Sequence, residues 1–134
     1  LFRIPRSQAW RFSGGFSFDT RDDWLNPRRG LFYATAVDFL RRKTSGSGGA
    51  TQDIRRTTLD FEGYWNWFGR HVWALGLHGR EVRFPGDFVP IEEQFYLGGS
   101  RSLRGYREDQ FRGSRMAWSN LEYRYVMGRR SRLF

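Results

Sequence analysis

The sequence predicts an all-β chain that forms part of an antiparallel, up-and-down transmembrane β-barrel. Three observations support this prediction. Apolar residues recur at every second position along five stretches, which is the period of a strand and not of a helix. Aromatic residues make up 19% of the chain, and 16 of its 134 residues are glycine. Charged residues occupy the alternate positions, so each strand carries rings on one face and charges on the other.

Five strands are expected, near residues 10–20, 31–43, 55–68, 71–84 and 114–127. Crossing a bilayer at the usual tilt takes about 9–11 residues, so each stretch is long enough. Their apolar positions are, in chain order, Trp10, Phe12, Phe16, Phe18, Leu31, Tyr33, Val37, Phe39, Leu59, Phe61, Trp65, Trp67, Trp73, Leu75, Leu77, Leu121, Tyr123 and Tyr125. Several of these tryptophans fall near strand ends, where membrane barrels carry an aromatic girdle.

The connections between these strands differ in length and chemistry. Residues 22–30 contain the turn formers Asn26, Pro27 and Gly30, and residues 44–51 are polar and rich in glycine. Gly69-Arg70 is short enough for a tight hairpin. Residues 85–113 are too long for a hairpin and are expected to form a functional loop that points inward. Sequential antiparallel pairing is the simplest topology for these elements.

Periodicity alone leaves two classes open. In a soluble sandwich or barrel the rings fill the interior, whereas in a membrane barrel they face lipid and the polar residues line the lumen. Acidic residues such as Asp60, Glu62 and Glu122 on the polar face favour a wet lumen. Five strands cannot close a membrane barrel, which takes about eight or more. We therefore expect residues 1–134 to be one partial barrel domain, completed by strands outside this chain.

Composition and spacing exclude several kinds of chemistry. The chain has no cysteine, and its two histidines, His71 and His78, are expected on opposite faces of one strand. The acidic neighbours Glu92-Glu93 and Glu108-Asp109 are interpreted as solvated loop surface. No catalytic residue, metal or cofactor is therefore expected. The net charge of +9 suits an acidic partner, but rings and charges on opposite faces argue against a nucleic-acid stacking surface.

The long loop contains the most specific motif of the sequence. Gly98-Gly99 allows a sharp turn, and Gly105 is expected to permit a close backbone approach. Between Leu103 and Gly105-Tyr106, Arg104 can extend a guanidinium into a polar lumen, where it needs a carboxylate partner. Glu122, on the polar face of the following strand, is the expected partner.

This motif and its surroundings resemble those of the BamA/TamA-type outer-membrane insertase superfamily, the bacterial surface antigen barrels. The family motif, GG followed three residues later by [VL]-R-G-[FY], matches Gly98, Gly99, Leu103, Arg104, Gly105 and Tyr106. In relatives the motif arginine contacts an acidic residue in an S-L-E-[FY] context, which here reads Asn120-Leu121-Glu122-Tyr123. A family turn pattern, D-x-R-D…P-x-x-G, matches Asp19, Arg21, Asp22, Pro27 and Gly30, where the acids are expected to fix the turn.

The resemblance implies five strands of a 16-stranded barrel in the outer membrane of a Gram-negative type of bacterium. It implies a protein that inserts, assembles or translocates other proteins without being an enzyme. The implied partners are outer-membrane lipid, client outer-membrane or secreted proteins and accessory assembly subunits, with no nucleic acid. The alternatives are the barrel anchor of a patatin-like surface phospholipase, a two-partner secretion transporter, and a soluble basic nucleic-acid-binding β domain.

Overall fold

Five long strands lie side by side in the computed structural model, which describes residues 7–44, 51–86, 89–100, 102–127 and 132–133. The long strands and their bounds are β1 (Ser7–Asp19), β2 (Gly30–Thr44), β3 (Thr51–Phe68), β4 (His71–Arg83) and β7 (Arg115–Val126). Between β4 and β7 stand a 3-10 turn, η1 (Ile91–Glu93), and two short strands, β5 (Phe95–Leu97) and β6 (Phe111–Gly113). The two-residue strand β8 (Arg132–Leu133) follows β7.

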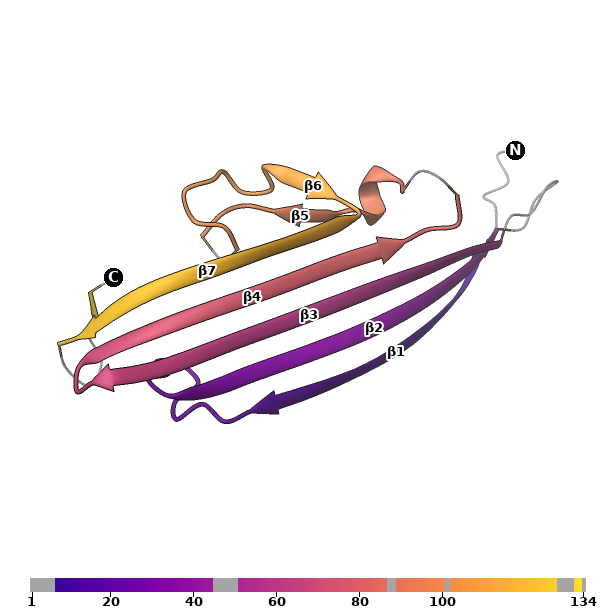
Figure 1. Ribbon diagram of the computed structural model, residues 1–134. Coiled ribbons are helices and arrows are strands. Elements are labelled where there is room, and N and C mark those ends of the chain that lie inside the picture. The colour runs from indigo at the N-terminus through magenta and orange to yellow at the C-terminus, as the bar shows by residue number, and fades with distance from the viewer. Residues whose placement is uncertain (1–6, 45–50, 87–88, 101, 128–131, 134) are drawn as a thin grey trace.

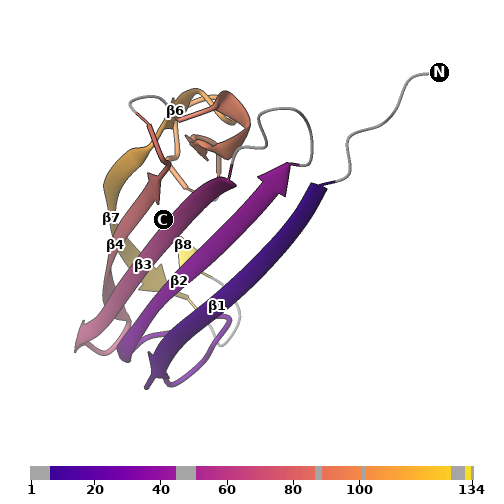
Figure 2. The same cartoon turned by 90° about the vertical axis from the view of Figure 1, so that its right-hand side faces the viewer.

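The main sheet has the order β1-β2-β3-β4-β7-β8, and every neighbouring pair is antiparallel. Its register is continuous apart from one shift between Asn66 and Phe68 in the β3–β4 pair. Figure 2 shows the sheet curving from β1 round to β7. The predicted all-β, up-and-down fold class is confirmed, as a part of a barrel whose sheet does not close within the described residues.

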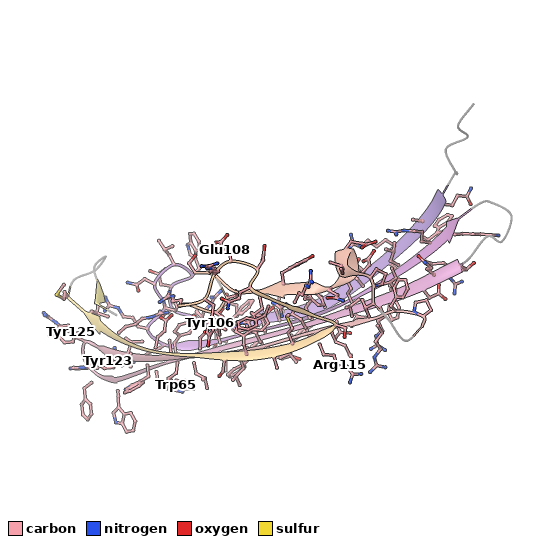
Figure 3. The ribbon with its side chains drawn as sticks, turned by 90° about the horizontal axis from the view of Figure 1, so that it is seen from above. Trp65, Tyr106, Glu108, Arg115, Tyr123 and Tyr125 are labelled. Carbon is pink, nitrogen blue, oxygen red and sulfur yellow. The ribbon has the colours of Figure 1, made fainter. Side chains whose placement is uncertain are left out.

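The two faces of the sheet differ in chemistry, as the period-two pattern predicts. The loop between β4 and β7 lies over part of the concave face, and Figure 3 shows its Tyr106 and Glu108 on one side of the sheet with Trp65 on the other. The convex face is a band of exposed large apolar side chains. These include Phe12, Phe16, Phe18, Leu31, Phe39, Leu59, Trp65, Trp73, Leu77, Leu121 and Tyr123.

The structure adds elements that alternation did not predict. The sequence predicts a long inward loop and no strands within it, but β5 and β6 pair there as a small hairpin with its own register from Phe95↔Gly113 to Leu97↔Phe111. Three-residue strands are too short to show a period in the sequence. The predicted polar connection at 44–51 lies mostly outside the described residues, which resume at Thr51. No described helix has the length and apolar character needed to cross a membrane.

Candidate functional site

The loop between β4 and β7 is held against the concave face at its start by a buried carboxylate. Glu93, at the end of η1, is 8% exposed, and its Oε2 atom lies 2.6 Å from Nη2 of Arg56 on β3. A second arginine, Arg42 of β2, lies 3.7 Å from Oε1 of the same residue. The Arg56 guanidinium also lies over the ring of Phe95 in β5, at 5.9 Å. The interpretation of Glu93 as solvated surface was therefore wrong.

The glycine pair after β5 forms a compact turn. Gly98 and Gly99 both have positive φ angles, 138° and 90°, which non-glycine residues rarely adopt. The Ser102 hydroxyl donates to the Gly98 carbonyl at 2.7 Å and accepts from the Gly98 N–H at 3.0 Å. Gly99 and Leu103 form an isolated antiparallel bridge. This geometry brings the Ser102 carbonyl to β7, where the Asn120 side-chain amide donates to it at 3.1 Å.

The motif arginine lies beside the carboxylate expected for it. Nη1 of Arg104 is 3.3 Å from Oε1 of Glu122 on β7. The other oxygen of Glu122 accepts from Nε and Nη2 of Arg124 at 2.9 and 2.7 Å. The Arg124 side chain is only 12% exposed, against 61% for Arg104. Glu122 therefore joins an exposed loop arginine to a mostly buried strand arginine, and the anchoring role of Arg104 remains a prediction.

The end of the motif differs from expectation. Gly105 was expected to allow a close backbone approach, but a Cβ built there meets no atom within 4 Å. Its φ of 89° accounts for the glycine instead. The close approach is at Gly98, where a Cβ would lie 2.2 Å from the Arg107 carbonyl oxygen. Tyr106 packs edge-on against Phe111 of β6, with ring centroids 5.1 Å apart.

A series of charged and polar side chains continues from Glu122 across the concave face. The Arg124 guanidinium lies over the ring of Tyr64 at 5.4 Å, and the Tyr64 hydroxyl donates to Glu62 at 2.8 Å. The other neighbour of Glu62 is Arg21, whose Nη1 is 3.1 Å from it. We call this series the concave-face network, from Arg104 through Glu122, Arg124, Tyr64 and Glu62 to Arg21 and Asp19.

Arg21 belongs to the turn between β1 and β2 and connects it to this network. Its Nε and Nη2 donate to the two oxygens of Asp19 at 2.9 and 2.7 Å. This bidentate hydrogen bond, together with the charge of Glu62, raises the pKa of Arg21 further above its ordinary value. The guanidinium also stacks on Phe32 at 4.6 Å. Arg21 is therefore a fixed, fully charged link between the turn and the sheet.

The remaining turn residues shape the backbone. Oδ1 of Asp22 accepts the N–H groups of Arg28 and Arg29 at 2.8 and 3.1 Å. Pro27 is buried, and Gly30 has a φ of 105° with the Thr20 carbonyl oxygen 2.3 Å from where a Cβ would stand. Asp22 therefore contacts the backbone at the far end of the turn.

The Asp22 carboxyl makes this turn sensitive to acid. Partial burial acts to raise its pKa, but the backbone N–H groups of Arg28 and Arg29 outweigh that effect and hold the pKa below its ordinary value. A lowered pKa means that the contribution to stability is present above about pH 4 and is lost as the pH falls through the folded-state pKa. Protonated Asp22 keeps only a weak acceptor for the two N–H groups.

We therefore expect Asp22→Asn to lower the free energy of unfolding at pH 7 by less than about 1 kcal/mol, because the Asp22 side chain is largely exposed. The difference from the unsubstituted protein should shrink between about pH 5 and pH 3. Urea unfolding of the complete protein in detergent or bilayers at several pH values measures it. A difference that stays constant or grows over this range would contradict the assignment.

A second group of charges lies on the same face near the middle of the sheet. Both oxygens of Asp60 accept from Nη2 of Arg80, at 2.7 and 3.0 Å, and Oδ1 also lies 2.7 Å from Nδ1 of His78. The His78 ring stacks on Trp118 at 4.9 Å. All these residues occupy the polar positions of β3, β4 and β7, as the alternation predicts.

Sequence reasoning missed three participants in these sites. Asp23 accepts the N–H groups of Leu25 and Asn26 and so fixes the turn together with Asp22. Glu93 pairs with Arg56 at 2.6 Å, and Arg124 pairs with Glu122 at 2.7 Å. Arg124 could have been found, because residues two apart on a strand share a face and Glu122 is two residues away. Glu93 could not, since only the folded loop buries it.

Comparison with known proteins gives two matches. Residues 5–132 match the family model described as the Omp85 superfamily domain. Over 128 residues the chain is 33% identical to the outer membrane protein assembly factor BamA of Nitratidesulfovibrio vulgaris. That alignment covers 83% of this chain and 15% of the relative, so the chain spans about a seventh of the relative's length.

Proposed function

The chain belongs to the Omp85 superfamily and is part of a β-barrel of the Gram-negative outer membrane, and from this we propose that the complete protein assembles, inserts or translocates other proteins at that membrane. The observation that carries the proposal is the loop between β4 and β7, which lies on the concave face with Arg104 beside Glu122. The relative's name, an outer membrane protein assembly factor, supports the same role.

We propose a mechanical role for the chain and no covalent catalysis. The loop fills part of the lumen side of the wall and is fixed at three points, by Glu93, Ser102 and Arg104. A wall supported in this way keeps its strands in register while a seam elsewhere in the barrel opens and client strands add to its edge by β-augmentation. Client proteins and accessory assembly subunits are the proposed protein partners, and lipid covers the convex face.

The test is Arg104→Ala in the complete protein, supplied to cells depleted of the natural copy. We expect folded client barrels in the outer membrane to fall several-fold, with a loss of about 1 kcal/mol in barrel stability, since the Arg104 ion pair is largely exposed. Immunoblots of client proteins and heat-modifiability of the barrel on gels measure the two effects.

Arg107→Ala is the matched control, because Arg107 is an exposed arginine of the same loop and no ion pair to its side chain is found among the described residues. Arg104→Lys tests whether charge alone is sufficient, since lysine cannot reproduce the planar guanidinium. Client levels under Arg104→Ala that equal those under Arg107→Ala would overturn the proposed role of the loop anchor.

A further inference from the structure

One row of side chains crosses the convex face close to the end of the strands where β2 stops and β3 begins. Phe12 of β1 pairs with Phe39 of β2, Phe39 with Arg55 of β3, and Arg55 with Arg83 of β4. Directly paired residues point to the same face of an antiparallel sheet, so two rings and two arginines stand in line. Arg55 and Arg83 are both exposed.

The two arginines occupy directly paired positions on β3 and β4, and the carboxylates near them do not neutralise both. Like charges directly opposite across two strands are destabilising. Glu81 is shared, with Nε of Arg83 at 3.2 Å and Nε of Arg115 at 2.8 Å from its Oε1 atom. Within the part of the chain that the structure describes, Arg55 has no carboxylate partner, and its guanidinium lies 5.6 Å from the Phe39 ring centroid. This pair therefore presents a site for an anion.

An apolar groove adjoins the arginine pair. It has a volume of about 840 Å³, and its lining includes the rings of Trp10, Phe12 and Phe39 together with Arg55. Asp53 also lines it, but both of its oxygens accept from Arg41, at 2.7 and 2.9 Å. The acid is thus already paired, and with Trp10 and Arg41 it lies one row nearer the strand ends than Arg55, so the groove is on the headgroup side of the row.

The height of the row on the sheet matches the level of lipid headgroups. Arg55 lies ten positions before Trp65 on β3, and Trp65 forms with Trp73 and Tyr123 a cluster of rings at the opposite end. At about 3.4 Å per residue and a tilt of about 40°, this is roughly 26 Å along the membrane normal. Membrane barrels have an apolar band about 25 Å tall, so Arg55 and Arg83 stand at its margin.

We propose that Arg55 and Arg83 bind the phosphate of an anionic membrane lipid whose acyl chain runs from Phe12 and Phe39 into the apolar band of the convex face. Arginine pairs recognise phosphate oxygens with two parallel N–H donors each, and a bound phosphate removes the repulsion between the two guanidinium groups. The rings offer apolar surface to the chain of the same molecule. Such a site requires only the membrane location of the barrel and is independent of client assembly.

The test uses the complete protein in vesicles that contain equal amounts of phosphatidylglycerol and phosphatidylcholine, followed by extraction and measurement of the retained lipid by native mass spectrometry. We expect the unsubstituted protein to retain phosphatidylglycerol preferentially. The double substitution Arg55→Gln, Arg83→Gln should reduce that retention about tenfold. Arg112→Gln, at an exposed arginine of β6 on the loop side, is the matched control and should retain the lipid fully.

Further variants and controls distinguish lipid binding from misfolding and from binding of free phosphate. Heat-modifiability establishes that each variant is folded, and Arg55→Gln alone replaces the double variant if that one does not fold. Phe39→Ala should weaken retention while leaving both charges in place. Equal retention by the double variant and the control would overturn the proposal. Displacement of the lipid by millimolar inorganic phosphate, with no effect of Phe39→Ala, would assign the arginines to free phosphate and overturn the lipid site.

Discussion

Glu122→Gln is expected to destabilise the barrel by about 3 kcal/mol, the cost of leaving a mostly buried charge without its partner. Glu122 accepts both donors of the Arg124 fork and lies beside Arg104. Glutamine offers one carbonyl oxygen and turns an N–H₂ group toward one of the guanidinium groups. Nη1 of Arg124 already lacks a hydrogen-bond partner among the described residues, so the variant leaves this arginine with little compensation.

Urea unfolding of the complete protein in bilayers measures this loss. Glu108→Gln is the matched control, since Glu108 is an exposed loop glutamate, and it should change stability by less than about 0.5 kcal/mol. Replacing Arg124 by methionine together with Glu122→Gln should recover part of the loss, because the variant then no longer buries a charge without a counter-charge. If Glu122→Gln unfolds at the same urea concentration as Glu108→Gln, the ion pair does not carry the stability assigned to it.

Gly98→Ala is expected to destabilise the packed loop by about 3 kcal/mol. Its φ of 138° is a region that only glycine occupies at low cost, and a Cβ there would lie 2.2 Å from the Arg107 carbonyl oxygen. Backbone, and not a flexible side chain, is the obstacle, so the loop has to shift as a whole. The contacts of Ser102 and Arg104 with β7 weaken as a result.

Trypsin cleavage within the loop, after Arg107 or Arg112, measures its opening. A loss of about 3 kcal/mol should raise the cleavage rate about a hundredfold if opening and closing are fast relative to cleavage. Gly105→Ala meets open space and carries only the cost of its φ of 89°, about 1 kcal/mol. Gly14→Ala meets no atom within 4 Å and should be neutral. Equal cleavage rates for Gly98→Ala and Gly14→Ala would contradict the packing described for this turn.

The fold was predictable because the two faces of each strand meet different environments. Phe12, Phe39 and Leu121 stand on the convex face, as their two-residue spacing indicates, while Asp60 and Glu122 stand on the concave face. This alternation lies within each strand's own sequence, so it can be recognised without knowing which strands pair. The contact between Arg104 and Glu122 was predictable from the motif, and the structure places the pair 3.3 Å apart.

The remaining features depend on how the loop packs against the sheet, and no local sequence pattern predicts that packing. Glu93 follows another glutamate, a pattern typical of a solvated loop surface. In the folded protein it is buried and paired with Arg56, 37 residues earlier in the chain. The strands β5 and β6 are three residues each, below the length at which alternation can be seen. The strong bond from Glu122 to Arg124 was missed because the motif directs attention to Arg104 alone.

The concave-face network has a mechanical consequence for the barrel wall. Hydrogen bonds between strands resist separation of neighbours, whereas side-chain links that run across the sheet, from Arg21 through Glu62 to Arg124, resist sliding of one strand past the next. A sheet restrained in both directions deforms as a stiff plate. We therefore expect strain imposed on the complete barrel to fall at its joints with other strands and at the register shift between Asn66 and Phe68, where the strand pairing is interrupted.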